Sequence, residues 1–488
     1  MLFNSLHFLL FFPIVVALFF VLPQKIRWAL LLIASYYFYM CWKIEYIFLI
    51  IISTLIDYYS SNQMSKTLQK TTRKKWLILS IITNLGLLLS FKYFNFISEN
   101  IRLLFNQFNI FYETPVFNLL LPVGISFYTF QTLSYTIDVY NGKTPAAKHL
   151  GIFAVYVSFF PQLVAGPIER SHRLLPQFFQ KHKFKYERVK AGLQQMMWGF
   201  FKKIVIADRL AIIVDGIYNN PYDYSGFALL LGTLFFTFQI YCDFSGYSDI
   251  AIGAAKVMGF ELMENFKRPY FSKSISEFWR RWHISLSTWF RDYLYIPLGG
   301  NRVLKWRWYY NLFITFLVSG LWHGANWTFI VWGALHGLYL IVAIIAKKPK
   351  KYIIDVLGLK GSFIYKLWQV GITFVLVLFA WIFFRANSIN DALYIIQHMF
   401  IDIGDYTDIE KMKLKFRGLG IQINDIIICL ILISFMEIYH LYERTGDVWK
   451  KLSLHPRILR WSVYYIILFS ILFLGPYTRV NNFIYFQF

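Results

Sequence analysis

The chain has 488 residues, of which 57% are hydrophobic, and its formal net charge is +23 at pH 7. Most of the hydrophobic residues lie in long runs, and so much apolar surface excludes an ordinary soluble globular protein. Lys and Arg fall in clusters between these runs, which is the positive-inside pattern of membrane proteins and not that of a nucleic-acid-binding protein. We therefore predict an all-α, polytopic integral membrane protein with a single domain, 1–488.

The N-terminal part predicts a series of transmembrane helices, at 6–22, 27–42, 45–57, 76–92 and 116–137. The first run lacks the flanks of a cleaved signal peptide, so we expect a retained helix. The basic cluster from Lys66 to Lys75 belongs on the cytoplasmic side of a cell (inner) membrane. Counting back through the runs from that cluster places the N-terminus outside.

The segment 151–168 departs from this simple count. It follows Lys148 and precedes a basic stretch that extends from Arg170 to Lys190, so both of its ends should be cytoplasmic. A re-entrant segment satisfies this pattern better than a full crossing. Re-entrant backbone at membrane depth must be covered by protein or by a water-filled cavity, which predicts helices arranged around a hollow.

The C-terminal half contains a second ambiguous run, 310–346, which predicts either two shorter passes or a broken helix. Three further crossings are predicted, at 364–384, 424–441 and 461–476. The acidic stretch around Asp405 should form an outside loop, and we expect Phe488 outside as well.

The segment around His283 predicts a helix on the cytoplasmic side that begins after a capping residue, Ser274, and ends in a turn at 297–302. In one continuous helix, Trp279 and His283 share a face, and Trp282 lies on the adjacent face. His283 would then point along an aromatic wall.

Three cations accompany this segment, namely Arg280, Arg281 and Arg291. Guanidinium groups suit an anionic ligand such as the phosphates of a coenzyme or of a carrier arm. The alternative is a basic interfacial helix that contacts lipid headgroups.

His323 lies in the middle of an apolar, aromatic segment. An ionisable group at membrane depth is costly and usually faces a polar cavity, so His323 is a candidate catalytic base. Gly320 and Gly324 allow another backbone to approach closely, and Ser319 and Asn326 lie one turn away on either side as possible partners of the imidazole. A hydrogen-bonded packing histidine is the alternative.

Other polar residues are predicted to be structural. His336 would point to a different face from His323 in a continuous helix, and Asp243 and Asp249 are first interpreted as buried hydrogen-bond partners, with proton or substrate ligands as the alternative. The sequence has no nucleophile elbow, Walker loop or His-Glu-x-x-His motif, and its three cysteines show no paired spacing. We predict no metal site.

Six strings carry a resemblance to a known family: 122–131, 160–169, 241–250, 278–285, 322–324 and the terminal 483–488. Together, and in this order, they resemble the membrane-bound O-acyltransferase family, in particular the branch of alginate O-acetyltransferase membrane subunits. The resemblance covers nearly the whole chain.

The resemblance implies a ring of tilted helices with re-entrant segments around a funnel, with His323 and His283 as the two motif histidines. We expect Trp279, Trp282 and Trp322 to line this passage, because a dry lining strengthens electrostatic interactions with a reacting carbonyl. The resemblance further implies a cytoplasmic thioester donor, acetyl-CoA, with no bound cofactor. The acyl group would cross the protein toward a polysaccharide such as alginate or peptidoglycan, with a separate extracytoplasmic SGNH-type acetyltransferase as partner.

In this interpretation His323 is the general base toward the receiving hydroxyl, and His283 orients the thioester or helps the thiolate leave. A transient acyl-histidine is the alternative chemistry. Two other functions stay open, namely D-alanyl transfer from a carrier protein to teichoic acid and non-enzymatic export of a glycan or lipid.

Overall fold

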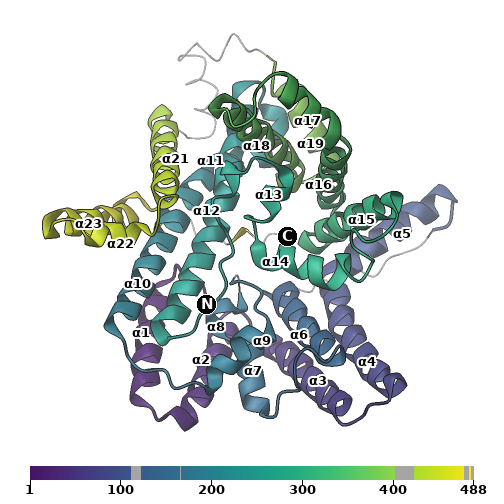
Figure 1. Ribbon diagram of the computed structural model, residues 1–488, viewed down its shortest axis with the longest axis vertical. Helices are drawn as coiled ribbons and strands as arrows, with labels where there is room; N and C mark the ends of the chain where they lie inside the picture. Colours follow the sequence, from purple (N-terminus) through teal and green to yellow (C-terminus); the bar gives the residue numbers. More distant parts are fainter. Residues whose placement is uncertain (112–121, 165, 402–421, 478–482, 485–488) are drawn as a thin grey trace. The chain divides into compact units, whose positions relative to one another are not determined.

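The computed structural model describes residues 1–111, 122–164, 166–401, 422–477 and 483–484, and the regular elements within them are helices (Figure 1). Seven helical segments of this part of the chain are long and apolar enough to cross a membrane. The predicted all-α, polytopic architecture is therefore confirmed. The expected outside loop around Asp405 and the expected position of Phe488 lie outside the described residues.

The chain divides into two compact units. Unit 1 comprises Met1–Met196 and Tyr247–Glu264, and unit 2 comprises Met197–Gly246 and Asn265–Phe488. The longest helix, α12 (Phe227–Met258), contributes residues to both units.

Unit 1 contains the N-terminal helices. They are α1 (Leu6–Val21), α2 (Arg27–Met40), α3 (Ile47–Ser65), α4 (Lys70–Leu88), α5 (Phe94–Gln107), α6 (Ile125–Tyr140), α7 (Leu150–Ser158), α8 (Phe160–Leu163), α9 (Ser171–Leu174) and most of α10 (Tyr186–Phe200). A π-helical turn, Leu89–Tyr93, joins α4 to α5, so the predicted run 76–92 is part of a longer continuous helical segment.

The predicted re-entrant segment 151–168 forms two short helices, α7 and α8, with a break at Phe159. The longer of the two has nine residues, which span about 14 Å at the rise of an α-helix. The hydrocarbon core of a bilayer is about 30 Å thick. Neither helix is long enough to cross it, as expected of a re-entrant segment.

Buried polar side chains connect α3, α4 and α6 inside unit 1. Asp57 accepts hydrogen bonds from Ser80 at 2.5 Å and from Asn84 at 3.0 Å, and Thr132 donates to Asn84 at 3.2 Å. Hydrogen bonds between helices hold membrane bundles together where the hydrophobic effect is weak. They explain why three otherwise apolar helices pack in one register.

Unit 2 contains the remaining helices. They are α11 (Asp208–Asn219), the first part of α12, α13 (Ile275–Trp279), α14 (Ile284–Phe290), α15 (Lys305–His323), α16 (Trp327–Ile345), α17 (Lys347–Val356), α18 (Phe363–Arg385), α19 (Ile389–His398), α21 (Ile423–Glu443), α22 (Val448–Ser453) and α23 (Arg457–Leu474). The run 310–346 thus forms two helices. The helix α12 is absent from the predicted crossings, although it is apolar and long enough to cross a membrane.

Three glycines let α15 and α16 pack closely (Figure 1). A methyl group on Gly320 would overlap the carbonyl oxygen of Phe329, and one on Gly333 would overlap that of Phe316. At Gly324 a methyl group would overlap the Phe329 ring. The close approach predicted from Gly320 and Gly324 is therefore observed within this helix pair.

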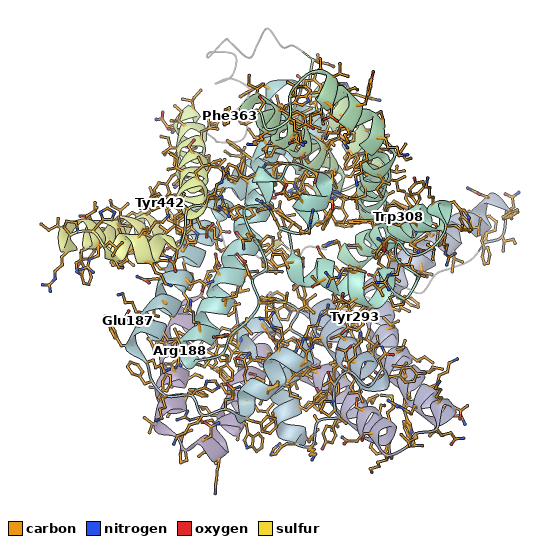
Figure 2. All side chains as sticks on the ribbon, in the orientation of Figure 1. Glu187, Arg188, Tyr293, Trp308, Phe363 and Tyr442 are labelled. Carbon is orange, nitrogen blue, oxygen red and sulfur yellow. The ribbon has the colours of Figure 1, made fainter. Side chains whose placement is uncertain are left out.

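The outer helices of unit 2 expose large apolar side chains. Phe363, at the start of α18, is 77% exposed, and Tyr442, near the end of α21, is 46% exposed (Figure 2). Both helices meet the length and hydropathy required to cross a membrane. Such apolar surface is what lipid tails would cover.

Candidate active site

His323 is the last residue of α15. Gly324 follows it in an extended conformation, so the helix stops at the histidine. The imidazole is 3% exposed, and its neighbours are the rings of Trp322 and Trp332 at 5.0 Å and of Phe384 at 5.3 Å between centroids. The surroundings exclude water, which strengthens electrostatic interactions with any group that binds there.

Of the two residues predicted to flank His323 by one helical turn, only Ser319 lies where the spacing placed it. Ser319 lies one turn before it in α15 and is buried, as the spacing predicted. Asn326 instead caps α16: its Oδ1 accepts from the N–H of Thr328 at 3.0 Å, and its amide donates to the carbonyl of Asn387 at 3.0 Å. The expectation for Asn326 was wrong because the helix breaks between His323 and Asn326.

The continuous helix predicted from Ser274 to the turn at 297–302 is also wrong. Ser274 does cap α13, but α13 ends at Trp279 and α14 begins only at Ile284. His283 stands between them as the N-terminal cap of α14, with a φ of 42° in the left-handed region. Trp279 and His283 therefore do not share a face of one helix.

Asn265 accounts for this break. Its carbonyl accepts from the N–H of Ile284 at 2.9 Å, and its side-chain Oδ1 lies 3.1 Å from Nδ1 of His283. The same Oδ1 accepts from the N–H and Oγ of Ser285, at 3.2 and 2.9 Å. Sequence reasoning missed Asn265, because it precedes α13 and no helical spacing relates it to His283.

The two histidines share one aromatic neighbour. The ring of Trp322 lies 6.3 Å from that of His283 and 5.0 Å from that of His323. Both histidines are buried. Within unit 2, the structure therefore brings the two motif histidines into one aromatic cluster, which their separation along the chain did not guarantee.

His336 belongs to the same cluster, although the sequence reasoning set it apart. The indole Nε1 of Trp279 donates to Nδ1 of His336 at 3.2 Å, and both side chains are buried. Trp332 lies between the histidines, 5.0 Å from the ring of His323 and 5.0 Å from that of His336. The sequence placed His336 on a different helix face from His323 by assuming one continuous helix. That assumption fails, because the helix breaks after His323.

Trp282 forms another wall of the cluster. It is 1% exposed, and its ring lies 5.1 Å from Phe266 and 5.0 Å from Trp381. The three predicted tryptophans, Trp279, Trp282 and Trp322, are thus all buried in unit 2.

The three predicted donor-binding arginines lie at the surface. Arg281 pairs with Glu277 at 2.6 Å, and Arg291 pairs with Asp292 at 2.8 Å. Arg280 is exposed and donates to the carbonyl of Ser276. Two of the three cations are therefore partly neutralised by neighbouring carboxylates.

A buried ion cluster adjoins the aromatic residues. Lys203 lies 2.5 Å from Asp243 and 2.9 Å from Asp208, and Asp243 also accepts from the N–H of Ile484 at 2.7 Å. The buried structural role expected of Asp243 is thus observed. The sequence analysis did not predict its partner, Lys203. A lysine within an apolar run is itself an indication of a buried ion pair.

Asp249 is a hydrogen-bond partner, as the sequence predicted, but it is only partly buried. It lies in unit 1 and accepts a hydrogen bond from Nε2 of Gln195 at 3.2 Å. Among the described residues, no group of three or more His, Cys, Asp or Glu side chains could hold a metal ion.

Comparison with known sequences gives a consistent picture. Residues 33–348, which include both motif histidines, match the MBOAT, membrane-bound O-acyltransferase family. The chain is 41% identical over 450 residues to "Probable alginate O-acetylase AlgI" of Pseudomonas putida, which covers 91% of this chain and 88% of that protein.

Two other relatives are more distant. The peptidoglycan O-acetyltransferase of Helicobacter pylori is 37% identical over 396 residues, which cover 76% of this chain and 73% of that protein. The teichoic acid D-alanyltransferase of Bacillus subtilis is 30% identical over 241 residues, which cover 46% of this chain and 60% of that protein.

Proposed function

Because this chain belongs to the membrane-bound O-acyltransferase family and is a multi-pass membrane O-acyltransferase, we propose that it moves acetyl groups toward an extracytoplasmic polysaccharide. The observation that carries this proposal is the pair of buried histidines, His283 and His323, whose rings both contact Trp322. Oriented imidazoles in a dry site are suited to the proton transfers of acyl transfer.

In the proposed reaction, the acceptor hydroxyl gives its proton to His323 while its oxygen forms a bond to the acyl carbon. The carbon–sulfur bond breaks, and the sulfur leaves with the electron pair as a thiolate. Such a base typically contributes about 10²–10⁴-fold to the rate. An acyl-histidine intermediate at the same residue is the alternative chemistry.

The proposed donor is acetyl-CoA from the cytoplasm. Arg280 and Arg291 are exposed, and Arg281 is partly exposed, so these guanidinium groups are accessible to phosphates. The positive-inside pattern supports an inner-membrane protein with its N-terminus outside and these arginines on the cytoplasmic face.

The relatives support polysaccharide acetylation over the alternatives. The alginate O-acetylases match 91% of this chain at about 40% identity, whereas the D-alanyltransferases match less than half of it. Alginate and peptidoglycan are the acceptors that the relatives' names suggest. An SGNH-type acetyltransferase outside the membrane is the proposed partner, and the exporter alternative loses its support because the family is enzymatic.

The direct test supplies purified protein in lipid vesicles with a polysaccharide acceptor such as alginate, and with acetyl-labelled acetyl-CoA or a D-alanyl-loaded carrier protein as the donor. We expect release of CoA and transfer of label from acetyl-CoA only, and loss of transfer in His323→Ala. Transfer from the D-alanyl carrier alone would contradict the proposed donor.

A further inference from the structure

The hydrogen bonds around Asn265 determine which nitrogen of His283 carries a hydrogen. The backbone nitrogen of Ser285 lies 3.2 Å from Oδ1 of Asn265, and a backbone N–H can only donate. The Asn265 atom at this position must therefore be the carbonyl oxygen and not the amide nitrogen. The hydroxyl of Ser285 lies 2.9 Å from the same oxygen and 3.4 Å from Nδ1 of His283, so its single hydrogen is donated to the nearer acceptor, Oδ1 of Asn265, and not to Nδ1.

This oxygen also lies 3.1 Å from Nδ1 of His283. A carbonyl oxygen cannot donate, so Nδ1 must carry the hydrogen of this bond. Burial lowers the pKa of His283 to about 3, so the imidazole is neutral at physiological pH and holds a single hydrogen. Its Nε2 therefore carries a lone pair.

The surroundings of His283 are aromatic. Three rings face it from three segments: Phe244 of α12 at 4.5 Å, Phe266 at 6.3 Å and Trp322 of α15 at 6.3 Å. The ionisable residues beside these rings in the sequence are Asp243, Lys267 and His323. Asp243 is held by Lys203, and desolvation is the cause of the lowered pKa of His283.

We propose that Asn265 is a positioning residue that holds His283 as the Nδ1–H tautomer, so that Nε2 accepts a hydrogen bond from the substrate. The backbone bond from Ile284 to Asn265 supports the same geometry by holding His283 in its left-handed conformation. The link to acyl transfer rests on the proposed function.

This assignment decides between the two roles that the sequence left open for His283. An imidazole with its hydrogen on Nδ1 cannot donate from Nε2, so it cannot protonate the leaving sulfur from that atom. It can orient a thioester by accepting from an N–H or O–H of the donor. His283 is therefore an acceptor in this site.

The first experiment reads the tautomer without any assay of activity. Protein labelled with ¹⁵N-histidine in lipid vesicles is measured by solid-state NMR, and His283 is assigned by the signal lost in His283→Gln. We expect a neutral ring protonated at Nδ1 in the wild-type protein. A ring protonated at Nε2, or a cationic ring, would overturn the proposal.

The second experiment tests Asn265 by two variants. Asn265→Leu removes the acceptor, and we expect the Nδ1–H signal to be lost and acyl transfer to fall about 10²-fold. Asn265→Asp keeps an acceptor oxygen, so it should retain the Nδ1–H bond and recover most of the activity. Its negative charge stabilises imidazolium and raises the pKa of His283, which should move the acidic limb of the pH–rate profile to higher pH.

Ser287→Ala is the matched control, because Ser287 lies in α14 and donates to Trp282 without contacting Asn265. It should leave the tautomer and the pH profile unchanged. An unshifted profile in Asn265→Asp together with full activity in Asn265→Leu would overturn the proposal. If His283→Gln stays active while Asn265→Leu still loses the Nδ1–H signal, the proposed function of His283 fails and the tautomer assignment stands.

Discussion

The two histidine segments of unit 2 are built in different ways. His323 sits at the end of α15, whose packing against α16 depends on glycines that are close to it in the sequence. His283 sits between two short helices, and its backbone and side chain are held by Asn265 from a preceding loop. One histidine is thus placed by a local pattern, and the other by a tertiary hydrogen bond.

This difference has a practical consequence. A local pattern such as Gly320 and Gly324 can be recognised from spacing, because the two glycines are close together in the sequence. The hydrogen bond between Asn265 and His283 cannot be recognised from spacing, because the two residues do not lie in one helix. Substitutions in the two segments should therefore distinguish a lower rate of acyl transfer from a lower stability of the fold.

The largest expected effect is on chemistry at His323. His323→Ala should lower acyl transfer by about 10²–10⁴-fold, because a positioned general base is removed. The thermal unfolding midpoint should change little by comparison. Transfer at the wild-type rate by a correctly folded variant would show that His323 is a packing residue.

The next effect is on the packing of α15 and α16. Gly320→Ala forces a methyl group against the carbonyl of Phe329, and overpacking of this kind typically costs about 1–3 kcal/mol. The matched control is Gly371→Ala in α18, where no atom lies within 4 Å of the added methyl group. The control should gain about 0.5–1 kcal/mol from helix propensity. Denaturant unfolding in detergent micelles measures both, and equal stability changes would argue against the close packing.

A smaller effect is expected at the bond between Trp279 and His336. Trp279→Phe keeps a ring but removes the donor to Nδ1 of His336, which should cost about 1 kcal/mol because a buried acceptor loses its partner. Adding His336→Phe to that variant should recover part of the loss. A double-mutant cycle without coupling between the two positions would exclude this hydrogen bond.

The smallest stability effect is expected at the surface. Arg281→Gln should reduce stability by less than about 1 kcal/mol, because its pair with Glu277 is partly exposed. If Arg281 contributes to donor binding, the KM for acetyl-CoA should rise while kcat is maintained. Glu277→Gln, which releases Arg281 from its pair, should lower that KM. Unchanged KM values in both variants would remove Arg281 from the donor site.

Much of the helical architecture could be predicted from hydropathy. The runs 364–384 and 424–441 differ from α18 and α21 by only one or two residues at each end. The prediction missed α12, which contains two acids, Asp243 and Asp249, within an apolar helix. Lys203, 40 residues away in the chain, neutralises the first of these acids in the folded protein.

The sequence by itself determined the fold class, the family resemblance and the two candidate histidines, because apolar run length and short motifs are local properties of a chain. Only the tertiary structure decided that His283 interrupts its helix, that Asn326 is a cap, and that His336 joins the cluster. The break at His283 and the position of His336 depend on contacts between segments that are distant in sequence, namely Asn265 with His283 and Trp279 with His336. Periodicity within one segment carries no information about such contacts.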